Sequence, residues 1–344
     1  MIAKETTFQI DKNDKFALIT LPFPNIDEGI TELSLGNNIW LTKHVPMNLA
    51  TNWQEWIGTI RNEQFQEANG LLIIKRPASQ PSALDSENQN LMRQICYVLD
   101  GLLIVKTTYC ESPPFLITGA NVDGTVSVRG IQELMQPVCK AFNQSSIMGK
   151  LEACDFQHAK KLGDAIESIN TTPGHSRLKR ALSAFYAGIW NTRPEERLHQ
   201  FCRSIDGIIF SRKGQGKRDF RERTRDFIGS NHDDIMDEIY QMRSAVEHLR
   251  PAESEIRNTD LRQRRLHILE RSLQSGAIAR FALQRVLLEE RLLNQFKNDQ
   301  TIESFWNKSE NIRRNEWGTS LDFNNDLQGL LDLQFVDDAD LGIS

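Results

Sequence analysis

The apolar residues of the first 140 positions occur in short runs of strand length. The runs are residues 16–21, 70–75, 101–106, 115–118 and 125–129. The last two flank a turn in which Gly124 can supply a positive φ, so they are expected to pair as a hairpin. A short helix is expected around Trp53 and Trp56, and residues 77–90 are expected to form an exposed loop.

From about residue 150 onward, apolar residues recur every three or four positions, which is the spacing of one face of a helix. Helices are expected over residues 176–190, 194–210, 233–250 and 261–296, with a break in the last near Gly276. Pro194 suits the first turn of its helix, and Pro251 ends the third helix. Residues 211–225 are expected to form a basic loop.

These patterns predict an α+β chain, in which a strand-containing N-terminal region precedes an all-α bundle. The expected boundaries are an α+β domain over residues 1–150, a helical bundle over residues 151–300 and an acidic C-terminal tail over residues 301–344. The acidic tail is expected to stay disordered or to fold over the basic surface of the chain itself.

Composition excludes several classes of protein. The 344 residues have a mean hydropathy of -0.45, and no apolar run approaches the ~20 residues that span a bilayer. The N-terminus lacks a signal pattern, so we expect a cytoplasmic protein without a membrane partner. Five widely spaced cysteines and scattered histidines show no ligand spacing, so no metal and no cofactor are expected.

Charge is distributed unevenly along the chain. The formal net charge of -5 combines -5 over residues 1–171, +7 over residues 172–297 and -7 over residues 298–344. Arginines make up 20 of the 24 cations in the basic block, and the planar guanidinium binds phosphate oxygens in pairs. The block therefore indicates a polyanion partner, although a helical surface of internal ion pairs explains it as well.

One pair of residues suggests chemistry. Arg243 and His248 lie at the end of a predicted helix, and two copies facing each other across a two-fold axis would form a compact cationic cleft. Histidine is suited to proton transfer near neutral pH, and arginine can stabilise the charge of a phosphoryl transition state. These groups suit attack of an RNA 2'-hydroxyl on its neighbouring phosphate, which leaves a 2',3'-cyclic phosphate and requires no metal.

The surrounding sequence resembles a HEPN domain, and most of all the Apea-like branch of that superfamily. The resemblance covers roughly residues 175–297 and depends on helix order and on the segment Ile239-Tyr-Gln-Met-Arg-Ser-Ala-Val-Glu-His248. It implies a helical bundle that pairs as a homodimer. It also implies a metal-independent endoribonuclease of anti-phage or toxin–antitoxin systems, whose motif is Arg, four to six residues, then His. Arg243 and His248 match that motif.

The resemblance also assigns supporting positions. Asp206 is the candidate for an acidic residue on an earlier helix. Apart from the resemblance, Glu247 lies next to His248 in the sequence, where it either tunes the imidazole or is an ordinary exposed residue of the helix. Ser244 stands where active members often carry Asn, Asp or His. This departure favours an alternative, in which the bundle is a non-catalytic dimerisation module that binds RNA or a protein partner.

The basic segment over residues 211–225, after the second bundle helix, is a candidate RNA-binding surface. Its members are expected to contact the backbone of single-stranded RNA, and a phenylalanine among them is expected to stack on a base. The residues are Arg212, Lys213, Lys217, Arg218, Phe220 and Arg221. The competing interpretation is a solvated loop that is neutralised by its own acidic residues. Another alternative for the whole chain is a regulatory protein, in which the acidic tail competes with nucleic acid for the basic bundle. Residues 1–150 are expected to dock a protein partner or sense a trigger.

Overall fold

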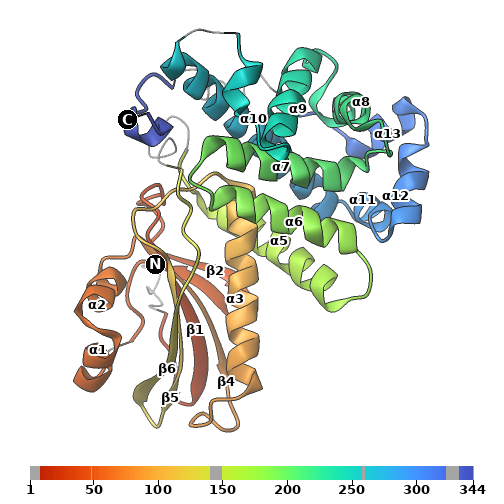
Figure 1. The fold of residues 1–344 in the computed structure, drawn as a ribbon. Helices are drawn as coiled ribbons and strands as arrows, with labels where there is room; N and C mark the ends of the chain where they lie inside the picture. The colour runs from red at the N-terminus through yellow and green to blue at the C-terminus, as the bar shows by residue number, and fades with distance from the viewer. Residues whose placement is uncertain (1–7, 48, 140–148, 258–259, 323–332, 344) are drawn as a thin grey trace. The chain divides into compact units, whose positions relative to one another are not determined.

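The computed structural model describes residues 8–47, 49–139, 149–257, 260–322 and 333–343. The chain is α+β, with the strands and helices that Figure 1 labels, and it divides into two compact units. The first unit comprises residues 1–137 and 148–167, and the second comprises residues 138–147 and 168–344. Within the described ranges, no helix is long and apolar enough to cross a membrane.

The first unit contains a six-stranded antiparallel sheet in the order β2-β3-β4-β1-β5-β6. The strands are β1 Asp14–Leu21, β2 Glu32–Gly36, β3 Ile39–Thr42, β4 Gly70–Pro77, β5 Phe115–Val122 and β6 Thr125–Glu133. The expected hairpin is confirmed, because Asp123 and Gly124 adopt φ angles of 53° and 91° between β5 and β6. Two consecutive positive φ values match the right-handed twist of the strands.

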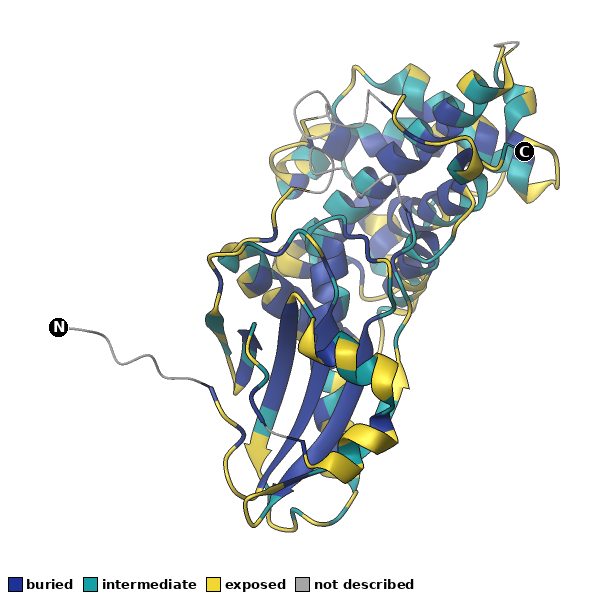
Figure 2. Cartoon of the chain, turned by 90° about the vertical axis from the view of Figure 1, so that its left-hand side faces the viewer, coloured by how far each residue is buried: buried dark blue, intermediate teal, exposed yellow. Residues whose placement is uncertain are grey.

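Helices cover both faces of this sheet, which explains why every residue of β1 is buried (Figure 2). Helix α3 (Ser86–Val105) packs on one face against β1, β4 and β5. The opposite face buries Phe16 and Leu18 beneath α1 (Thr51–Ile57) and α2 (Thr59–Gln66). The short helix expected around Trp53 and Trp56 is α1.

The apolar run at residues 101–106 is helical, so the strand expected there is wrong. It forms the buried end of α3, and the loop expected over residues 77–90 is shortened because α3 begins at Ser86. Gly101 explains the choice, since a Cβ at this position would lie 2.1 Å from the backbone oxygen of Ala159. The close approach of α3 to α5 (Ala153–Thr171) requires glycine and buries the run on all sides.

The second unit is helical. Its helices are α6 Ser176–Ile189, α7 Pro194–Ile209, α8 Gly216–Ile228, α9 Asp233–Glu247, α10 Leu261–Leu288, α11 Glu290–Gln295, α12 Asp299–Trp306 and α13 Glu310–Trp317, with 3-10 turns at Ala252–Glu255 and Ala339–Leu341. Helix α7 is central and packs against α6, α8, α9 and α10.

Helix α10 runs without a break through Gly276, so the interruption expected there is wrong. The ring of Phe201 on α7 occupies the space beside this glycine, and a Cβ on Gly276 would lie 2.8 Å from the ring. Gly188 on α6 contacts the same ring from the other side. Gly276 therefore allows Phe201 to pack closely against α10. The helix expected over residues 261–296 is interrupted instead at Glu289, between α10 and α11.

Two expected irregular segments are ordered helices. Most of the predicted basic loop is α8, which buries Phe220, Thr224 and Phe227 at helical spacing. The predicted tail over residues 301–344 begins as α12 and α13, because Phe305 and Trp317 bury their rings in the bundle. The expectations for residues 323–332 lie outside the described residues.

Candidate functional site

Arg243 is held on the last turn of α9 by two carboxylates from different helices. Its Nη2 donates to Asp206 Oδ2 on α7 at 3.1 Å, and its Nη1 lies 2.7 Å from Glu247 Oε2, one turn further along α9. Its guanidinium also lies over the ring of Tyr240, 5.4 Å from the centroid. The structure thus places three of the predicted site residues together and fixes the guanidinium plane.

His248 is the residue that ends α9. Its amide bonds to Ser244 O and Ala245 O, so it caps the helix, and its side chain is exposed. Ser244 is half-buried on the last turn. Among the described residues, no hydrogen bond or ion pair joins His248 to Arg243, and the carboxylate partners of Arg243 are Asp206 and Glu247.

Leu249, the next residue, has an unusual exposure and backbone. It adopts a φ of 56°, the position normally taken by glycine after a helix, while Arg250 N bonds back to Ala245 O at 2.8 Å. Its side chain is 96% exposed. A fully exposed leucine in a left-handed conformation contributes no apolar packing to the stability of the isolated chain.

The acidic partner of Arg243 is itself strongly affected by burial. Burial raises the pKa of the Asp206 carboxyl, and the positive charge of Arg243 and a hydrogen bond from Ser211 Oγ act in the opposite direction. Arg243 therefore compensates a carboxylate that is costly to leave alone, which ties the orientation of the guanidinium to the packing of α7 on α9.

A histidine that the sequence analysis did not select belongs to this cluster. His199 lies on α7, and burial lowers its pKa, with the positive charge of Arg243 acting in the same direction. His199 and Asp206 are seven residues apart, or two helical turns, so they share a face of α7. The seven-residue spacing between His199 and the predicted site residue Asp206 is the sequence signal that places this histidine in the cluster.

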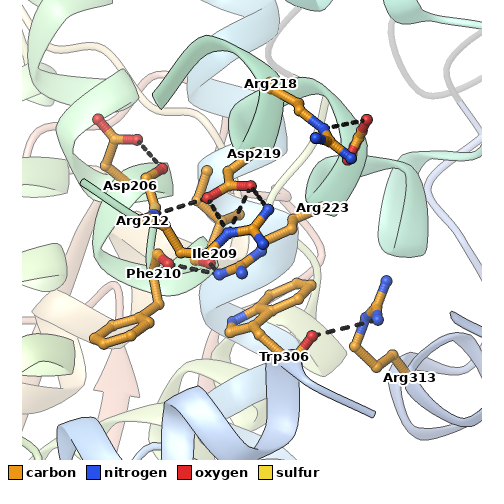
Figure 3. A network of polar contacts seen from close by, with 11 residues as sticks. Asp206, Ile209, Phe210, Arg212, Arg218, Asp219, Arg223, Trp306 and Arg313 are labelled. Atoms are coloured by element: carbon orange, nitrogen blue, oxygen red, sulfur yellow. Dashed lines mark hydrogen bonds and ion pairs between the residues drawn. The ribbon is translucent and has the colours of Figure 1, made fainter. Parts of the chain in front are cut away.

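The basic segment is largely occupied by contacts within the bundle. Figure 3 shows Arg212 wrapped around the buried carboxylate of Asp219, and its Nε donates to both carboxylate oxygens, at 3.2 and 3.0 Å. Arg223 Nη1 donates to the carbonyls of Ile209 and Phe210, at 2.8 and 2.5 Å, which satisfies the C-terminus of α7. These arginines stabilise the fold, and Arg212 remains half-exposed.

The other predicted RNA contacts differ in how free they are. Arg218 pairs with Glu222, and Lys217 and Arg221 share Asp237, whereas Lys213 is exposed. Phe220 is fully buried against Tyr240, with ring centroids 5.5 Å apart. The expectation that this ring stacks on a base is therefore wrong, because helix α8 turns it into the core.

Helix α9 is also joined to α10 by a half-buried charge network around His267. His267 Nε2 lies 2.6 Å from Glu238 Oε1, and the hydrogen bonds of Glu238 and Glu270 raise the pKa of His267 to about 9. Arg271 Nε bonds to the second oxygen of Glu238 at 2.7 Å. This network fixes the angle at which α9 presents Arg243.

His267→Gln is expected to lower the free energy of unfolding by about 1.5–3 kcal/mol at about pH 6. Because the folded pKa is raised, the stabilisation is fully present below the ordinary value of 6.5 and is lost as the pH rises through about 9. Urea unfolding of both proteins across this range measures the difference. A gap between them that stays constant up to about pH 10 would contradict the charged pairing.

No family model matches the chain, and no curated protein or solved structure matches it either. In the part of the chain that the structure describes, no group of three or more His, Cys, Asp or Glu side chains is arranged to hold a metal ion.

Proposed function

We propose that this protein is a cytoplasmic, metal-independent endoribonuclease of the HEPN type that acts as a homodimer. The observation that carries the proposal is the fixed guanidinium of Arg243 beside a helix end at which His248 and Leu249 are exposed. A second copy of this helix end would bring two arginines and two histidines around one phosphate. Arg243 would bind the phosphoryl oxygens, and His248 would transfer the proton.

The partner and setting follow from the same proposal. Single-stranded RNA would approach the exposed cations Lys213, Arg218 and Arg212. The first unit would receive a trigger or a protein partner, and its exposed Trp56 and Ile60 offer an apolar surface for it. By resemblance, the setting would be anti-phage defence or a toxin–antitoxin pair.

A specific observation also supports the non-catalytic alternative. Both terminal nitrogens of Arg243 already bind carboxylates. Ser244 also stands where active members of the family often carry Asn, Asp or His. Phosphate binding therefore requires Glu247 to move aside. Its side chain is 45% exposed, so solvent can accommodate that movement.

The direct test is cleavage of an end-labelled single-stranded RNA by the full chain in the presence of EDTA. The expected products carry a 2',3'-cyclic phosphate and a 5'-hydroxyl, and DNA of the same sequence stays intact because it lacks the nucleophile. RNA binding without cleavage would replace the proposal with the non-catalytic module.

Leu249→Asn tests the homodimer. Asparagine tolerates a positive φ, so the free energy of unfolding is expected to stay the same or rise by up to about 1 kcal/mol. Self-association is expected to weaken, because the variant removes an apolar side chain from the proposed interface. Sedimentation equilibrium over a concentration series measures this. Leu261→Asn, at another exposed leucine, is the matched control, and equal dimer affinity for both variants would exclude Leu249 from the interface.

A further inference from the structure

The second unit contains a cavity of about 500 Å³ that the proposed nuclease site does not use. Its walls are the first turn of α7, one side of α10, and the C-terminal segment over residues 336–342. This volume lies in the range of small-molecule sites, which is roughly 300–1,000 Å³.

An uncompensated arginine lines this cavity. Arg197 is 1% exposed, and its Nη2 donates to Asn191 O at 2.6 Å. Its Nε has no hydrogen-bond partner, and no ion pair joins it to a carboxylate within the described ranges. A guanidinium buried without a counter-charge is costly, so an anion in the cavity would satisfy it.

The start of α7 supplies a second reason for an anion. Arg193 is the N-cap residue, and because a guanidinium can only donate hydrogen bonds, it does not cap the amides that follow Pro194 in the first turn. The N-terminal end of a helix attracts negative charge, and Arg193 also lines the cavity. Arg265 on the α10 wall is already paired with Glu195 and Glu253, so Arg193 and Arg197 remain to bind the anion.

The C-terminal segment lines one side of the cavity and contributes apolar residues and one acidic residue to it. Arg262 on α10 holds it by an ion pair to Asp338 and by bonds to Gln334 O and Val336 O, at 3.1 and 2.8 Å. Leu341 is 1% exposed. Asp340 also lines the cavity, which disfavours a bare polyanion and favours a ligand that carries hydrogen-bond donors besides its anionic group.

We propose that this cavity binds a ribonucleoside monophosphate, whose phosphate lies between Arg193, Arg197 and the first turn of α7. The ribose hydroxyls and base provide donors for the wall that the C-terminal segment forms. Binding therefore ties this segment to the bundle. The site is independent of RNA cleavage, and its test does not depend on the proposed nuclease.

Isothermal titration of the full chain with the four ribonucleoside monophosphates tests the proposal, with inorganic phosphate and adenosine as further probes. At least one monophosphate is expected to bind, and adenosine is expected to bind about tenfold or more weakly than its monophosphate because it lacks the charged group. The absence of binding by all four, or equal binding of adenosine and its monophosphate, overturns the proposal.

Two variants at the cavity and one control variant locate the site without disturbing the buried Arg197. Arg193→Ala is expected to weaken binding about tenfold, and Arg180→Ala, an exposed arginine of α6 outside the cavity, leaves it unchanged. Arg262→Ala is expected to weaken binding by loosening the C-terminal segment. Hydrogen exchange of residues 333–343 is expected to slow when the ligand is added. If Arg193→Ala binds as tightly as the unchanged chain, the cavity is not the site.

Discussion

His248→Ala is expected to lower the rate of RNA cleavage by about 10²–10⁴-fold, the usual contribution of a general acid or base. The fold is expected to be unaffected, because this side chain is exposed and alanine can keep the capping amide bonds. Initial rates on the end-labelled RNA, with circular dichroism to confirm the fold, measure the effect. His232→Ala, at the other end of α9, is the matched control and is expected to retain full activity.

The same assay decides between two histidines. His199 lies within the electrostatic reach of Arg243 in one chain, whereas His248 requires a second copy to approach a shared phosphate. If His199→Ala abolishes cleavage and His248→Ala does not, the active pair is His199 with Arg243, and the dimeric arrangement is wrong. Arg243→Lys keeps the charge that Asp206 needs but loses the planar fork, so cleavage is expected to fall while folding is retained.

Helix periodicity predicted α7 well because this helix buries one face. The expected helices beginning at 176, 194 and 261 match α6, α7 and the start of α10. Periodicity failed where an apolar run is short and wholly buried, since such a run suits a strand and a helix equally. Residues 101–105 are the example: they continue the helix that begins at Ser86, and Gly101 allows that helix to approach Ala159 closely.

Local sequence patterns predicted the candidate site along α9, and the family resemblance added Asp206 on α7. Spacing identified Arg243 and His248, but the contact between Arg243 and Asp206 depends on how α7 packs on α9, which no local pattern encodes. In the basic segment, the charges indicated an exposed RNA-binding surface. The structure instead shows Arg212 bound to the carboxylate of Asp219 and Arg223 bound to a carbonyl at the end of α7. Counting charges cannot show which of them have internal partners.

Arg313→Ala is expected to lower the free energy of unfolding by about 3–5 kcal/mol, the cost of stranding a buried charge. Arg313 Nε bonds to Asp226 Oδ2 at 2.6 Å, which joins α13 to α8, and the Asp226 side chain is fully buried. Urea unfolding at about pH 7 measures the loss. Arg314→Ala is the matched control, because Arg314 lies 3.8 Å from the same carboxylate and is 41% exposed, and it is expected to cost less than about 1 kcal/mol.

The pH dependence of the Arg313→Ala variant identifies the stranded group. Burial raises the pKa of Asp226, and the hydrogen bond and charge of Arg313 oppose that rise, so removing Arg313 raises it further. A carboxyl whose folded pKa is raised stabilises the fold below its unfolded pKa, and this contribution is lost as the pH rises through the folded value. The variant is therefore expected to recover stability toward acid pH, and adding Asp226→Asn is expected to restore it near neutral pH. A deficit that neither acid nor the second substitution reduces would assign the loss to the other bonds of Arg313, to Trp306 O and Lys308 O.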